Sequence, residues 1–66
     1  MQVGDVNRNG QVLLRKTSQK STTHRFATVW VMQCEAKKHE YGSNSCDAHQ
    51  RLCPSCVPAA KPGEPF

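Results

Sequence analysis

The sequence has few of the large apolar side chains from which a hydrophobic core is built. Hydrophobic residues make up 36% of its 66 positions, and only four residues are aromatic. A chain this short buries a small share of its surface on folding, so a thin core seldom stabilises it alone. We therefore expect one small domain whose fold depends on something besides apolar contacts.

Long apolar runs are also missing, and the first ten residues lack the basic and apolar regions of a signal peptide. We therefore expect a cytoplasmic protein with no membrane partner. In a reducing compartment, its four cysteines indicate metal binding rather than disulfides. The sequence has no paired carboxylates, no nucleophile beside a base and no glycine-rich phosphate loop. It therefore predicts a binding module without a small-molecule substrate, and not an enzyme.

Two segments predict β-strands. Residues 10–17 are rich in branched apolar side chains and follow the turn signal Asn9-Gly10. Residues 24–34 alternate between two faces, one with Phe26, Thr28, Trp30, Met32 and Cys34, the other with Ala27, Val29 and Val31. The large side chains of the first face, those of Phe26, Trp30 and Met32, are expected in the core rather than as a platform on which nucleic-acid bases stack. Residues 18–23 are polar and predict a loop, and residues 2–6 could add a short partner strand.

The second half predicts less regular structure. Ser45 can cap a short helical turn within residues 45–52. Residues 58–66 are rich in proline and predict an extended, flexible tail after a single domain of residues 1–57. The fold class expected is small and mostly β, with two or three antiparallel strands, one short helical turn and a metal ion joining them.

Cysteine spacing carries the strongest chemical signal. Cys53 and Cys56 form a C-x-x-C loop, and Cys34 ends a predicted strand upstream. Zinc prefers four tetrahedral sulfur or nitrogen ligands, often from two such loops. The first loop would place its second cysteine at position 37, but that residue is Lys37, which cannot bind zinc while protonated.

Three residues could replace the missing ligand. His39 would close a short loop with Cys34, and Cys46 would restore a site of four thiolates. His49 would share a face with Cys46 and Cys53 if this segment were helical. His39 and Cys46 rank equal, ahead of His49. In each case the four protein ligands leave no open position for water, so the Zn²⁺ would be structural.

The hairpin that ends in Cys34, followed by a gap and Cys-Pro-Ser-Cys, resembles the zinc ribbons over residues 10–57. The stretch HEYGSNSCDAHQRLCPSC with its Pro-Gly tail is similar to small bacterial ribbon proteins with a degenerate first knuckle. In zinc ribbons the first knuckle carries two cysteines. The resemblance therefore implies a structural zinc site, and Lys37 marks the departure from the family pattern.

Two other interpretations of these cysteines are weaker. Cys34 alone could be a small buried apolar side chain at the end of a strand. The C-x-x-C pair could be a redox dithiol, but that chemistry usually has a βαβ scaffold around it, and only a proline-rich tail follows Cys56. Metal binding accounts for all three cysteines together.

Acidic residues are scarce in the first half, which therefore holds the whole net charge of +4. Four basic residues could form one patch about the predicted hairpin, namely Arg15, Lys16, Lys20 and Arg25. Such a patch would contact the phosphates of DNA or RNA. Charges on loops are also commonly just solvated. The alternative is therefore a protein-interaction module, which docks on a larger partner through a strand edge or the tail.

Overall fold

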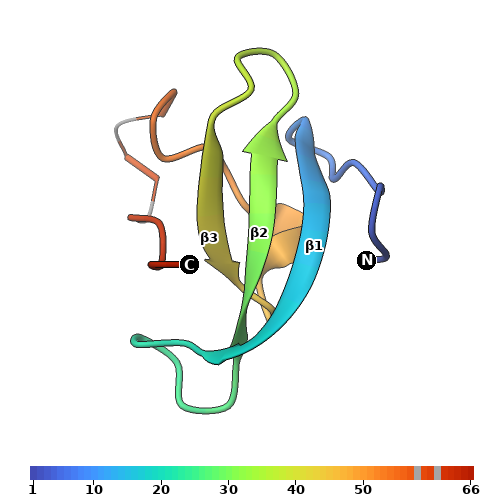
Figure 1. The fold of residues 1–66 in the computed structure, drawn as a ribbon. Coiled ribbons are helices and arrows are strands. Elements are labelled where there is room, and N and C mark those ends of the chain that lie inside the picture. The colour runs from blue at the N-terminus through green and yellow to red at the C-terminus, as the bar shows by residue number, and fades with distance from the viewer. Residues whose placement is uncertain (58, 61) are drawn as a thin grey trace.

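The computed structural model of the protein describes residues 1–57, 59–60 and 62–66. Strands β1 (Gln11–Lys20), β2 (Thr28–Cys34) and β3 (Glu40–Asn44) form an antiparallel sheet in the order β1-β2-β3, followed by the 3₁₀ turn η1 (Ala48–Gln50). Figure 1 shows an open, curved sheet with η1 behind it and the two chain ends beside opposite edges. The predicted mostly-β fold with one short helical turn is confirmed. No helix in the described part of the chain could cross a lipid bilayer.

The central strand β2 buries side chains on both faces, as its alternating sequence predicts. On the face covered by η1, Met32 and Cys34 join a cluster of buried residues that also contains Leu13, Tyr41, Ala48 and Cys53. On the opposite face, Val29 and Val31 are completely buried. The core is therefore thin and divided between the two sides of one sheet.

The expectation that Phe26 lies in this core is wrong, because its side chain is 85% exposed. β2 begins only at Thr28, and a turn precedes it in which the amide of Ala27 donates to the carbonyl of His24 at 3.1 Å. The apolar alternation continues in the sequence beyond the point where the strand begins. Trp30, by contrast, packs against the buried cluster as predicted.

The edges of the sheet differ from the sequence expectation in two further ways. β1 extends to Lys20 and includes part of the segment predicted as a loop, with irregular pairing to β2 between Leu13 and Arg15 and again between Lys16 and Lys20. The N-terminal residues form no strand. They make a single bridge between Val6 and Val12 along the outer edge of β1.

Residues 62–66 pack along the outer edge of β3. The amide of Glu64 donates to the carbonyl of Gly42 at 2.8 Å. Gly42 is required there, because a Cβ atom would lie 2.9 Å from Val29 Cγ1 and closer still to the Glu64 carbonyl oxygen. These residues belong to the segment predicted as a flexible tail, of which positions 58 and 61 lie outside the described residues. The division of the chain after residue 57 stays a prediction.

Candidate metal centre

The sulfur atoms of three cysteines meet where β2 ends. Among the described residues, Cys34, Cys53 and Cys56 form a group whose sulfur atoms all lie within 4.8 Å of one another. The Sγ atoms of Cys34 and Cys56 are 3.7 Å apart. Cys34 and Cys53 are buried, whereas Cys56 is exposed. Three soft ligand atoms at this separation are compatible with a metal-binding module.

The turn from β2 to β3 positions Cys34. Its carbonyl accepts from the amide of Lys38 at 2.7 Å, and its own amide donates to the carbonyl of His39 at 2.9 Å. The turn closes tightly because Lys38 adopts a left-handed conformation with φ of 60°. A further bond, from the Glu35 amide to the Gly10 carbonyl at 2.9 Å, ties this turn to the start of β1.

A second turn carries Cys53 and Cys56, closed by a bond from the Val57 amide to the Cys53 carbonyl at 3.0 Å. Two N-terminal side chains hold the segment that leads to it. Asn7 Nδ2 donates to the carbonyl of Ala48 at 2.9 Å and to that of Arg51 at 3.1 Å. Asn9 Nδ2 donates to the carbonyl of Gln50 at 3.1 Å. The sequence suggested only a turn at Asn9, and no local pattern indicates contacts so distant along the chain.

The thiols differ in how readily they ionise. The backbone amide of Lys37 donates to the Cys34 sulfur, which outweighs burial and lowers the pKa of that thiol to about 7. The pKa of Cys56 is raised to about 11, first because its thiol donates to Cys53 and then because burial disfavours the charged form. The Cys34 thiol therefore ionises more readily than the Cys56 thiol, which lies against it.

Of the three candidates for a fourth ligand, His39 contacts two of the clustered cysteines. Its Nδ1 is 3.9 Å from Cys53 Sγ and 3.8 Å from Cys56 Sγ. The residue is exposed and stands between the turn and β3, but its ring is not within 4.8 Å of all three sulfur atoms. An ion bound by all four residues would draw the ring toward Cys34.

The other two candidates lie elsewhere. Cys46 is exposed and is not part of the cysteine group. It lines an open cavity of about 570 Å³ together with residues such as His24, Arg51 and Glu64. His49 is exposed on η1. The helical face that would unite Cys46, His49 and Cys53 does not form, because the only helical residues of this segment are those of the single turn η1.

The four basic residues predicted to form a patch do not all share a face. Arg15 pairs with Val31 and its guanidinium lies over the Phe66 ring, 5.8 Å from the centroid. Lys16 pairs with Trp30, and its ammonium lies 4.5 Å from the centroid of that ring. Because neighbouring strand residues point to opposite faces, these two charges are separated by the sheet.

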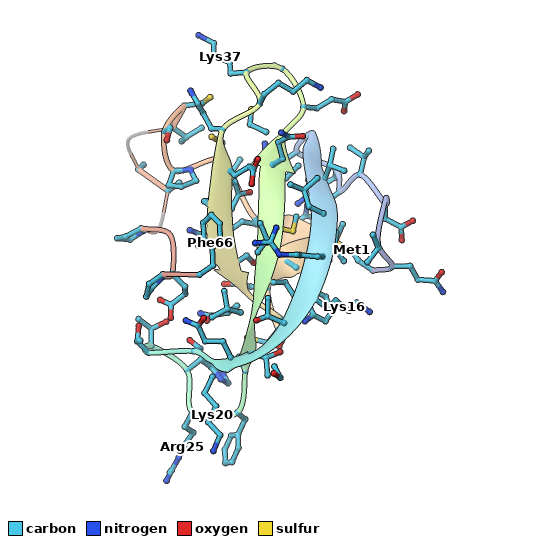
Figure 2. All side chains as sticks on the ribbon, viewed as in Figure 1. Met1, Lys16, Lys20, Arg25, Lys37 and Phe66 are labelled. Atoms are coloured by element: carbon cyan, nitrogen blue, oxygen red, sulfur yellow. The ribbon has the colours of Figure 1, made fainter. Side chains whose placement is uncertain are left out.

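Lys20 and Arg25 come together at one end of the molecule. Figure 2 shows the side chains of Lys20, at the end of β1, and of Arg25, in the β1–β2 loop, projecting from the same end, with Lys37 pointing away from the opposite end. Lys20 pairs with Thr28 at the base of that loop. The structure therefore brings together two of the four predicted residues at this end, whereas Lys16 lies further along the sheet and Arg15 on the face opposite to Lys16.

No protein-family model, no curated protein and no solved structure matched this chain in three comparisons. The fold and the site alone therefore define its class, a small mostly-β domain in which three cysteines form a potential metal centre.

Proposed function

We propose that the protein is a zinc-ribbon-like binding module, in which Cys34, Cys53, Cys56 and His39 hold one structural Zn²⁺. The observation that carries this proposal is the spacing of the sulfur atoms. Around a tetrahedral zinc ion with bonds of about 2.3 Å, two sulfur ligands lie about 3.8 Å apart. The Cys34 and Cys56 sulfur atoms, at 3.7 Å, already have that separation.

The position of His39 supports its role as the fourth ligand. A nitrogen and a sulfur bound to the same zinc ion lie about 3.5 Å apart. The distances of 3.8 and 3.9 Å from His39 Nδ1 to two of the sulfur atoms exceed that value slightly. A modest rotation of an exposed ring would close the difference and also bring it toward Cys34.

A structural zinc ion would stabilise a fold that has few apolar contacts. The centre joins the β2–β3 turn to the turn at Cys53, two parts of a chain whose buried cluster is small. Four protein ligands leave no coordination position for a reacting water, so the proposed role is binding and not catalysis. Because the site does not exist in the unfolded chain, the free energy of zinc binding would add to the free energy of folding.

Cobalt substitution tests the ligand set. Co²⁺ bound tetrahedrally by thiolates gives visible absorption whose intensity and charge-transfer bands report the number of sulfur ligands. Zinc-binding energies of about 10–16 kcal/mol, shared among four ligands, imply about 3 kcal/mol for each. His39→Ala should therefore weaken binding about 100-fold. Cys46→Ser is the matched control and should leave both spectrum and affinity unchanged. If Cys46→Ser alters the spectrum and His39→Ala does not, the assignment of His39 is wrong.

We further propose that the module contacts the phosphate backbone of a nucleic acid through the β1–β2 hairpin, with Lys16, Lys20 and Arg25 as the principal contacts. The supporting observation is that the hairpin itself carries only positive charges, because no acidic residue occurs between Asp5 and Glu35. Cationic side chains that release counterions from phosphates give affinity that falls steeply with salt. Arg15, on the other face of the sheet, belongs to the proposal as a weaker contributor.

A titration with DNA and RNA at two salt concentrations tests this role. Lys20→Gln and Arg25→Gln should each weaken binding and reduce the salt dependence by about one unit of slope. Lys37→Gln removes an equal charge at the opposite end of the molecule (Figure 2) and should have little effect. If no nucleic acid binds even at low salt, the nucleic-acid role is wrong and a protein partner becomes the better hypothesis.

A further inference from the structure

The phenyl ring of Phe26 is exposed to solvent, although this protein has few large apolar side chains with which to build a core. An exposed apolar side chain by itself needs no explanation. This phenyl ring, however, is 85% exposed in a chain that has only four aromatic residues and a thin core. It occupies the β1–β2 loop, which also carries the positive charge of Arg25 and has Lys20 at its base.

The loop that presents Phe26 is held in place from inside the molecule. The amide of Ser21 donates to the carbonyl of Ala27 at 3.0 Å, which closes the base of the loop. Within it, the Phe26 amide donates to His24 Nδ1 at 3.4 Å. The Glu64 carboxylate accepts from the Thr22 amide at 2.7 Å and from neighbouring hydroxyl groups. The ring is thus presented by a preorganised loop, which lowers the entropy lost on binding.

The charges around the ring are cationic. The guanidinium of Arg25 lies 5.4 Å from the ring centroid, and Lys20 stands at the base of the same loop. Glu64 also touches the loop, but its carboxylate is occupied by the hydrogen bonds of Ser21, Thr22 and Thr23. An exposed aromatic ring with one cation against it and a second cation at the base of the same loop suits single-stranded nucleic acid, because a base can stack on the ring while phosphates meet the charges.

We propose that Phe26 stacks on an unpaired base, so that the β1–β2 loop binds single-stranded nucleic acid in preference to a duplex. This inference rests on the phosphate-binding role proposed above and adds a contact that phosphate alone does not need. A base paired within a duplex is covered on both faces by its neighbours, so an isolated ring at a loop tip cannot stack on it without opening the helix. Lys20 and Arg25 then hold the adjoining phosphates.

Fluorescence anisotropy with the full-length chain tests the inference. A short labelled oligonucleotide of mixed sequence is compared with a duplex of the same length, for wild type and for Phe26→Ala. Base stacking on an aromatic side chain predicts a loss of at least about fivefold in single-strand affinity for Phe26→Ala. Duplex affinity and salt dependence should not change, because the charges remain.

Three further variants separate stacking from other contacts. Phe26→Trp should retain single-strand binding, whereas Phe26→Leu, which is apolar but cannot stack, should lose it. Phe66→Ala is the matched control, since it removes a second exposed phenyl ring outside the loop, and should bind as wild type does. Because Phe26 is exposed, circular dichroism of its variants should match that of wild type.

The possible outcomes test base stacking by Phe26 separately from phosphate binding by the hairpin. Equal single-strand affinity of wild type and Phe26→Ala, or of wild type and Phe26→Leu, overturns the stacking role and leaves phosphate binding intact. Absence of binding to either oligonucleotide at low salt overturns both. Binding to vesicles of phosphatidylserine and phosphatidylcholine without binding to oligonucleotides would show that the loop recognises a lipid surface, and would also overturn both.

Discussion

Replacement of Gly42 by alanine tests how the C-terminal residues pack on the sheet. The added methyl group would lie 2.9 Å from Val29 Cγ1 and nearer still to the backbone oxygen of Glu64. The backbone at Glu64 makes the closer of these two contacts and must leave β3, and the completely buried Val29 side chain must shift slightly as well. Gly42→Ala should therefore release residues 62–66 while the three strands remain paired.

The expected cost follows from the contacts that are lost. The bond from the Glu64 amide to the Gly42 carbonyl contributes about 1 kcal/mol, and the partly buried hydrogen bonds of the Glu64 carboxylate contribute a similar amount together. Alanine restricts the unfolded chain more than glycine does, which offsets a few tenths of this. The net loss is about 2 kcal/mol, equivalent to a fall in Tm of about 10 °C.

Thermal unfolding and amide hydrogen exchange measure the two effects separately. Protection of the Glu64 amide should be lost in Gly42→Ala and kept in Gly10→Ala. The control adds the same methyl group where nothing lies within 4 Å, at a positive φ of 73°. It should cost only the backbone strain of about 1 kcal/mol. A Gly42→Ala protein as stable as wild type, with the Glu64 amide still protected, would refute the described packing.

Two further predictions concern single side chains. Hydrogen bonds from residues 21–23 lower the pKa of Glu64 below its usual value of 4.5, so the contact stabilises the fold above that pH and is lost as the pH falls through the lowered pKa. The difference in unfolding free energy between wild type and Glu64→Gln should thus shrink as the pH drops below about 4.5, and a constant difference would contradict this assignment. Lys38→Gly relieves a left-handed conformation, so the free energy of unfolding should be unchanged or slightly higher. The control Lys37→Gly should lower it by about 0.5–1 kcal/mol in denaturant unfolding. Equal losses for the two variants would show that Lys38 is unstrained.

The sequence predicts the centre of this fold better than its edges. Alternation reveals β2 because that strand is buried on both faces. β3 is not recognisable, since Tyr41 is its only large apolar residue and Gly42 is there to admit the C-terminal residues. The same alternation misplaced Phe26, because it continues through the turn that precedes β2. Where a strand is covered by residues distant in the sequence, as β3 is by residues 62–66, the local sequence need not alternate between apolar and polar side chains.

The metal centre was predicted in part. The spacing of Cys34, Cys53 and Cys56 indicated their proximity, because a strand end and a C-x-x-C loop are common components of such sites. The choice between His39 and Cys46 depended on whether residues 46–53 form a helix, which the sequence alone did not decide. The sequence also did not reveal that Arg15 and Lys16 lie on opposite faces of the sheet. Their orientation depends on the extent of β1 and on its irregular pairing with β2.

Zinc analysis of the purified protein tests the central claim most directly. The account predicts one zinc ion for each chain purified without added metal, and loss of the sheet on treatment with a strong chelator, followed by circular dichroism and by the fluorescence of Trp30. Restoring Zn²⁺ should restore the fold. A metal-free protein with reduced thiols, whose spectra and unfolding temperature are the same before and after the chelator, would contradict the claim that an ion joins the two turns.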